Sequence, residues 1–442
     1  MFMKKLLLLI TLISSVSLSA QFKVSTLKIP TNDLVYNPVT NKIYVTIPSS
    51  YGTNGNSIGI INPSNMTLEK TVFVGSEPSI MDISDNGQYI YVGFTGSATV
   101  RRFNVNTETA EIQFPLGSDS FSGPFYAYDI AVMPGSPNTI AVSRVVKGST
   151  GFYGVAIYDT GVARAKTTIS TYPNNDSYVI RFANNTTMWG FNNHSTGFDF
   201  NKLTVDANGV KEGLNVGSIV NSFSVNDFVF DKNKTRVFFE YGDVVDLALS
   251  VPTAIKSSTG NRDHFTDGIP YTLGTFPGAT GRVTYDPIKD LACYATNSDS
   301  YNSTSPITFK RYNPNTFLLY DSQLISGYTG QVKHITFCGG GRYAFNTIDN
   351  VFLLKDLTAD MGSINSSYSK INISPNPVTT QFTFKTEVNI NRLQILDLSG
   401  KIIADIQQPD NAINVSDIAN GTYIVKCFDE QKVCYTGKFV KK

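Results

Sequence analysis

The feature that most constrains this chain is a pattern of four short apolar segments that recurs about every 50 residues. Its clearest copy spans residues 79–117, where turns rich in Asn, Asp, Gly and Thr separate the segments. Segments of this length and composition predict β-strands. Because one four-stranded sheet is too small to bury its own faces, several copies must pack side by side.

Seven copies can be aligned on the apolar residue that ends the first strand of each copy. A second strand follows after a short turn, and the third strand ends in Asn or Asp in six of the seven copies. These residues favour tight turns because their side chains bond the nearby backbone. Seven such units predict an all-β chain with a seven-bladed β-propeller over residues 21–360. The aligned residues are Tyr36, Ile83, Val132, Phe182, Phe230, Tyr285 and Phe337.

Two of the second strands resemble a known repeat. Lys42-Ile-Tyr-Val-Thr and Gln88-Tyr-Ile-Tyr-Val are similar to the repeats of YVTN-type β-propellers. The resemblance implies the propeller fold. It implies no particular activity, because propellers host both binding and catalysis.

The last copy ends at Asp356, after only three strands. Residues 22–29 alternate apolar and polar side chains and precede the first copy, so they belong to none of the seven units. We predict that they supply the missing fourth strand of the last copy. That pairing would close the ring and remove an exposed sheet edge.

The N-terminus has the order of charge, apolar run and small residues that is typical of a secretory signal peptide. Lys4 and Lys5 precede the apolar residues 6–13, and we expect residues 1–20 to be removed near Ala20. The apolar run is too short for a transmembrane helix, and no later segment is longer, so we expect an exported chain without a membrane anchor. Removing the two lysines changes the formal charge from +1 to −1, since 34 basic residues then face 35 acidic ones. This near-neutral charge gives no reason to expect a nucleic acid partner.

Composition changes near the C-terminus. Residues 361–370 are small and polar and are typical of a linker. Residues 371–442 alternate apolar side chains between Pro and Gly turns, which predicts a small, Ig-like β-sandwich.

Residues 371–442 also resemble the type A C-terminal sorting domain of the type IX secretion system. The resemblance implies a Gram-negative cell of the Bacteroidota type, contact with the type IX machinery and export to the cell surface or the medium. It also implies that the domain is removed for release or used for surface attachment. The alternative is an ordinary adhesive module. The matching residues are Pro375, Asn376, Pro377, Asp397, Gly400, Gly421 and Tyr423, followed by a basic tail.

Four cysteines in an exported chain allow two disulfides. Cys427 and Cys434 flank a short turn and could face each other across a hairpin. Cys293 and Cys338 lie in neighbouring repeats. The alternative is four buried thiols, and the sequence does not decide between them.

No catalytic motif is present, and the histidines fall at different phases of the repeat, so neither a metal site nor another cofactor is expected. Ionisable residues do recur three positions before the aligned residues. The first strand of each blade lines the central channel, so these side chains would meet at its mouth as a binding site. The alternative is a channel with a wet, polar lining. The candidate residues are Asp33, Asp129, Asp227, Arg282 and His334.

The sequence therefore predicts a secreted or cell-surface binding protein whose ligand is a protein or a glycan. Four loops rich in Tyr, Ser, Gly and Asn are candidate contact surfaces, at residues 47–56, 117–126, 145–153 and 296–306. The alternative function is a hydrolase or lyase that acts through Asp129, Asp227 and Arg282. A compact cluster of carboxylates with shifted pKa values would favour the enzyme.

Overall fold

The structure is a computed structural model, and it divides into two units, residues 1–357 and residues 358–442. The predicted leader, the linker and Gly400 lie outside the described residues. None of the described residues belongs to a helix with the length and hydropathy needed to span a bilayer. The structure describes residues 22–148, 151–169, 176–194, 198–217, 219–220, 227–247, 253–254, 276–297, 306–357, 371–384, 389–397, 402–429 and 434–442.

Over its described residues, the first unit forms seven antiparallel sheets, and most of them contain four consecutive strands. The first sheet contains β2 (Leu34–Asn37), β3 (Lys42–Ile47), β4 (Ser57–Asn62) and β5 (Thr67–Phe73), with the 3-10 helix η1 (Ser49–Asn54) between β3 and β4. The second contains β6 (Pro78–Ile83), β7 (Tyr89–Phe94), β8 (Thr99–Asn104) and β9 (Thr109–Pro115). The third contains β10 (Ser118–Asp119), β11 (Gly123–Val132), β12 (Thr139–Val146), β13 (Phe152–Asp159) and β14 (Val162–Ala163).

The remaining sheets of the unit follow the same plan. The fourth contains β15 (Val179–Asn184), β16 (Thr187–Phe191), β17 (Phe200–Asp206) and β18 (Gly209–Val216). The fifth contains β19 (Phe228–Phe230), β20 (Arg236–Phe239), β21 (Val244–Asp246) and β22 (Thr253–Ala254), with the 3-10 helix η2 (Glu240–Gly242) between β20 and β21. The sixth contains β23 (Arg282–Asp286), β24 (Leu291–Asn297), β25 (Pro306–Tyr312) and β26 (Leu319–Thr329). The seventh contains β27 (His334–Phe337), β28 (Arg342–Asn346), β29 (Asn350–Asp356) and β1 (Phe22–Lys28).

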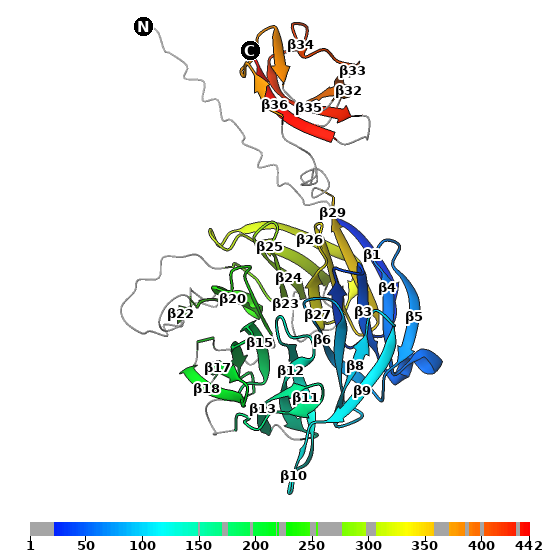
Figure 1. Cartoon of the computed structure of the whole chain (residues 1–442), viewed down its shortest axis with the longest axis vertical. Helices are drawn as coiled ribbons and strands as arrows, with labels where there is room; N and C mark the ends of the chain where they lie inside the picture. The colour runs from blue at the N-terminus through cyan, green and yellow to red at the C-terminus, as the bar shows by residue number, and fades with distance from the viewer. Residues whose placement is uncertain are drawn as a thin grey trace, which may run out of the picture. The chain divides into compact units, whose positions relative to one another are not determined.

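Inner strands of most neighbouring sheets contact one another in chain order. Contacts join β2 to β6, β6 to β11, β11 to β15, β19 to β23, β23 to β27, and β27 back to β2. The fourth and fifth sheets are joined by a shared apolar core that includes Val179 of β15 and Phe228 of β19. Figure 1 shows β6, β23 and β27 toward the middle of the unit and β5, β9 and β18 at its rim. The sheets therefore follow one another around a closed circuit.

The N-terminal strand completes this circuit, as we predicted. β1 pairs antiparallel with β29 along its whole length, from Phe22 opposite Asp356 to Lys28 opposite Asn350. The chain then continues into the first sheet, where Lys333 Nζ donates to the Thr31 carbonyl at 3.0 Å. Lys333 and Thr31 lie 302 positions apart in the sequence. Hydrogen bonds therefore hold together the beginning and the end of the first unit.

A buried arginine lies beneath this junction, and we call its surroundings the closure network: Arg311, Asp321, Asp356 and Phe22. Arg311 of β25 is fully buried, donates to Asp356 Oδ2 at 2.6 Å and forms a two-bond pair with Asp321 of the adjacent strand β26. The Phe22 ring covers the guanidinium, with its centroid 4.7 Å from Cζ. The closure network therefore links the sixth sheet, the seventh sheet and the N-terminal strand.

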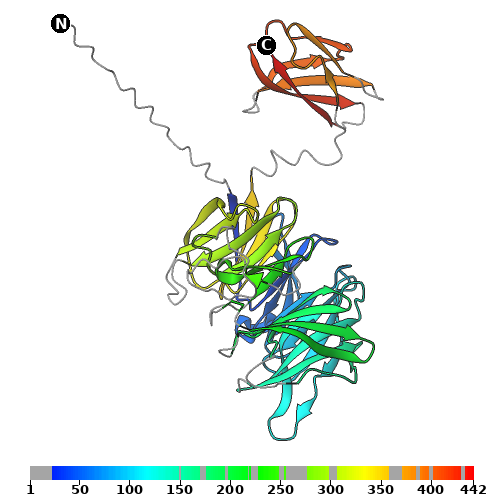
Figure 2. The same cartoon turned by 90° about the vertical axis from the view of Figure 1, so that its left-hand side faces the viewer.

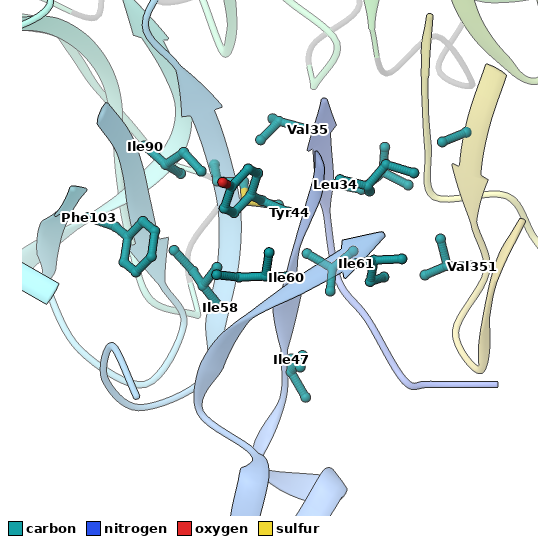
Figure 3. Close-up of a cluster of buried hydrophobic side chains, with 14 of the residues drawn as sticks. Leu34, Val35, Tyr44, Ile47, Ile58, Ile60, Ile61, Ile90, Phe103 and Val351 are labelled. Carbon is teal, nitrogen blue, oxygen red and sulfur yellow. The ribbon is translucent and has the colours of Figure 1, made fainter. Parts of the chain in front are cut away.

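Apolar cores fill the spaces between neighbouring sheets. Second strands such as β3 are buried at nearly every residue, because sheets cover both of their faces. Outermost strands such as β5 contain only exposed and half-buried residues. In Figure 3, Tyr44, Ile60 and Phe103 lie on one side of the first sheet, and Leu34 and Val351 lie on the other. Burial of this surface supplies the main driving force that holds adjacent sheets together.

The second unit contains two sheets over its described residues, drawn in orange to red in Figure 2. Apolar residues of both sheets, including Phe382, Ile395 and Phe439, form one shared core. The smaller sheet contains β30 (Ile373–Ser374), β31 (Gln381–Phe384) and β34 (Ala412–Asn414). The larger contains β32 (Ile390–Leu396), β33 (Ile402–Gln407), β35 (Gly421–Asp429) and β36 (Cys434–Lys441).

The pairing of β35 with β36 bears on the possible disulfide. Cys427 lies opposite Tyr435, and Cys434 lies opposite Phe428. Successive residues of a strand face opposite sides of a sheet, so this register does not set the two cysteines against each other. Cys427 is buried in the shared core of the second unit. Cys293 and Cys338 are buried thiols in the first unit, and burial raises the pKa of Cys338 to about 12.

Candidate functional site

Aspartates at the inner strands tie each of the first three sheets to the next sheet. Oδ1 of Asp33, Asp82 and Asp129 accepts the amide of the following residue, at 2.7 to 2.9 Å. Oδ2 of each accepts an amide from the neighbouring sheet, and these donors are Met81, Val132 and Ile180 at 2.8, 2.7 and 2.7 Å. The inner strands are edge strands whose outward amides need acceptors, and the carboxylates supply them.

Arg181 extends this arrangement to the fifth sheet. Its Nη1 donates to Asp129 Oδ2 at 2.6 Å, and its Nη2 donates to Asp227 Oδ1 at 2.7 Å. Burial lowers the pKa of Arg181, but the fields of Asp129 and Asp227 outweigh burial and raise it above its usual range. Burial raises the pKa of Asp129 to about 7 and that of Asp82 to about 6. One guanidinium thus bridges two carboxylates.

The other candidate residues form two further pairs. Arg282 Nη1 donates to the buried Glu240 Oε1 at 2.7 Å, and Arg282 Nε donates to the Val332 carbonyl at 3.3 Å. His334 Nδ1 lies 3.3 Å from Asp33 Oδ1. Each predicted site residue therefore has a specific partner within the protein.

The structure thus brings Asp129 and Asp227 together through Arg181, and it pairs Asp33 with His334. Arg282 is engaged by Glu240, and the charge of Asp227 also acts on it. Sequence reasoning missed Asp82, Arg181 and Glu240. A signal for Asp82 and Arg181 was available, because each lies one position before an aligned residue. The positions one and three before an aligned residue are on the same face of the strand.

A second candidate site is the hairpin formed by β10 and the start of β11, within the predicted contact loop 117–126. Asp119 Oδ1 accepts the amides of Phe121 at 3.0 Å and Ser122 at 2.9 Å, which lowers the pKa of Asp119. Tyr153 of β13 donates its hydroxyl to Ser122. Phe121 at the tip is 98% exposed. In Figure 1 the hairpin, labelled β10, projects from the rim of the unit.

The sorting-motif residues organise the end of the chain. Asn376 Nδ2 donates to the Lys438 carbonyl at 2.9 Å, and the Val440 amide donates to Asn376 Oδ1 at 2.9 Å. The next residues continue the contact, since the Val378 amide donates to the Val440 carbonyl at 2.8 Å. The segment Pro375–Pro377 therefore holds β36 on the side away from β35.

The other described motif residues support the same strand. Tyr423 donates its hydroxyl to the Ala419 carbonyl at 2.8 Å, and its ring stacks on Phe439 of β36 with centroids 5.5 Å apart. Gly421 begins β35 opposite Lys441. Asp397 directly follows β32. In the described parts of both units, no group of three or more His, Cys, Asp or Glu side chains is arranged to hold a metal ion.

Comparison with known proteins identifies the C-terminal unit and the fold of the first. Residues 372–442 match the family described as the secretion system C-terminal sorting domain. Kuenenia stuttgartiensis hydrazine synthase is similar in structure, with a TM-score of 0.54 and 10% identity over 75% of this chain and 96% of that one. The β-propeller domain of Myceliophteria thermophila Cps50 (Swd1) is also similar, with a TM-score of 0.53 and 9% identity over 76% of this chain and 99% of that one. No curated protein matches the chain.

Fold and motif together define a class: an all-β protein with a β-propeller fold and a C-terminal sorting domain. A sorting domain of this kind implies type IX export, interaction with the type IX machinery and a secreted or cell-surface location. At these identities, the similarity to the two solved structures concerns the fold alone.

Proposed function

We propose that this chain is a type IX secretion cargo that acts as a binding protein outside the cell. Residues 1–20 are its signal peptide, residues 21–360 are a seven-bladed propeller of YVTN-like repeats, and residues 371–442 are an Ig-like sorting domain after a linker. The observation that carries the export proposal is the match of residues 372–442 to the sorting-domain family. The seven sheets and the closed circuit of contacts support the blade count.

The hydrogen bonds of the inner-strand carboxylates support binding rather than catalysis. Both oxygens of Asp33 and both oxygens of Asp129 accept backbone amides, so these groups have a structural task. The hairpin exposes the Phe121 side chain to solvent, and hydrogen bonds to Asp119 hold the turn that carries it. Rigid aromatic tips make good contact residues because little conformational entropy is lost on binding. We place the protein or glycan ligand at this hairpin.

One observation favours the alternative, a hydrolase or lyase. Asp129 and Asp227 share the Arg181 guanidinium, and the pKa of Asp129 is raised to about 7. A carboxyl group that titrates near neutrality is suited to general acid–base catalysis. The two aspartates and Arg282 would then be the reacting groups.

The export proposal is tested by expressing the Asn376→Ala variant in a type IX-secreting bacterium. We expect the amount of this variant in the medium to be at least about tenfold lower than that of the wild type. The substitution removes both side-chain bonds to β36, each worth about 1 kcal/mol. Immunoblots of the medium, surface and periplasm measure the distribution. Asn414→Ala is the matched control, because the Asn414 side chain accepts hydrogen bonds from the amide and hydroxyl of Ser416 in a local turn. Normal export of the Asn376 variant would contradict a role for this contact in sorting.

The binding proposal predicts that Phe121→Ala weakens binding at least about tenfold, which corresponds to the loss of one aromatic hot spot. An array of glycans and cell-surface proteins is probed with the wild-type chain. The ligands that bind are then titrated with the Phe121→Ala variant and with a control variant. Val39→Ala is the control, since Val39 is also exposed, at 70%, but lies in a turn of the first sheet. Equal binding by the Phe121 variant would place the ligand elsewhere.

A further inference from the structure

Among the described strands, the outermost strand of each sheet in the first unit pairs with a strand of its sheet on one side only. Proteins usually protect such edges with charged side chains or by keeping the strand short. Six of the seven outermost strands described for this unit follow the rule. β1, β5, β9 and β18 each carry lysine or glutamate, and β14 and β22 contain only two residues.

β26 is the exception. It contains 11 residues, and Asp321 is its one charged residue. The Asp321 carboxylate turns inward to Arg311, and its side chain is only 7% exposed. The edge instead exposes apolar side chains: Leu319 is 44% exposed, Tyr320 56% and Leu324 52%. A long, uncharged and apolar edge of this kind is suited to pairing with another strand.

We propose that β26 is a dimerisation edge, which pairs antiparallel with β26 of a second copy of this chain. A pairing centred on Ser322 places Tyr320 opposite Leu324 of the partner subunit and Asp321 opposite Gln323 of the partner subunit. Apolar side chains then meet apolar ones, and no like charges face each other. A two-fold axis through Ser322 makes the interface self-complementary, as closed dimers require.

The outermost strand β5 lacks this self-complementarity. β5 carries Glu69 and Lys70, which form ion pairs with Lys42 and Glu108 inside the unit. Pairing β5 with a copy of itself would disturb these ion pairs or set like charges against each other. The charge pattern therefore selects β26.

Sedimentation velocity of the mature chain, residues 21–442, tests the proposal from low to high micromolar concentration. The wild type is expected to form a concentration-dependent dimer. Leu324→Lys places a charge on each strand of the interface, and we expect it to raise the dissociation constant at least about tenfold. Phe73→Lys is the matched control, because Phe73 is 64% exposed on the outermost strand β5, and it should leave the dimer unchanged.

Circular dichroism and thermal melts establish that both variants are folded. Ser322→Cys gives a second readout, because residues on the two-fold axis face each other and should cross-link under mild oxidation. A wild type that stays monomeric throughout would overturn the proposal. So would a dimer that tolerates Leu324→Lys, or one that does not cross-link at residue 322.

Discussion

Replacing Arg311 with alanine is expected to lower the free energy of unfolding of the first unit by about 3–5 kcal/mol. The side chains of Arg311 and Asp356 are both 0% exposed, and that of Asp321 is 7% exposed. Without the guanidinium, the Asp321 carboxylate loses both of its bonds while it stays buried. Asp356 loses the guanidinium and keeps the bond from Lys289, whose Nζ donates to Oδ2 at 2.7 Å. Urea denaturation followed by tryptophan fluorescence measures the change.

Lys70→Ala is the control for this experiment, because it also removes one cation of an ion pair. Lys70 and Glu108 are 49% and 41% exposed, so water screens the pair, and its loss should cost less than about 1 kcal/mol. A loss at Arg311 as small as the loss at Lys70 would show that the closure network contributes little to stability.

Deleting residues 22–28 is expected to abolish cooperative unfolding of the first unit. β29 would keep β28 but lose its outer partner along its whole length, and Arg311 would lose the aromatic ring of Phe22 that covers it. The milder change Phe22→Ala should lower the free energy of unfolding by about 3 kcal/mol, since Phe22 also packs on Phe309 with ring centroids 5.2 Å apart. Lys28→Ala on the same strand is exposed and should have little effect.

A peptide of residues 22–29 added to the truncated chain should restore the cooperative transition, because it would pair with β29 and return the Phe22 ring to Arg311. Recovery would be measured by chemical denaturation at increasing peptide concentration. A truncated chain that unfolds with the midpoint and slope of the wild type would show that β1 does not close the ring.

The repeat pattern was enough to predict how the chain ends pair. Residues 22–29 formed a predicted strand that belonged to none of the seven copies, and the last copy lacked a fourth strand. Pairing the two gave the strand a partner and completed the last sheet. This inference needed backbone hydrogen bonding alone. It did not depend on the identity of any side chain.

The candidate site was harder to predict, because the sequence does not show what an aspartate binds. Asp33 and Asp129 lie where ligand-binding carboxylates would lie, and both bond backbone amides of adjacent sheets. A carboxylate that joins two sheets needs the same residue type at the same repeat position as one that binds a ligand. The burial of Arg311 could not be predicted from the sequence, since an arginine in a strand usually extends into solvent.

The cysteine pair was left open for a different reason. A turn of suitable length would allow Cys427 and Cys434 to face each other, but the register of β35 and β36 is one residue away from direct opposition. Because side chains alternate, a shift of one residue moves a side chain to the other face of a sheet. The sequence specifies the two strands more strongly than it specifies their register.

The origin of the closing strand has a consequence for maturation. The seventh sheet takes its last strand from the N-terminus, while the polypeptide leaves that sheet through Leu357 toward the second unit. Among the described strands, those of the first unit pair only with one another, so a protease that cut after Leu357 would break none of these pairs. Release of the tail would leave each described strand of the propeller with the partners it has now.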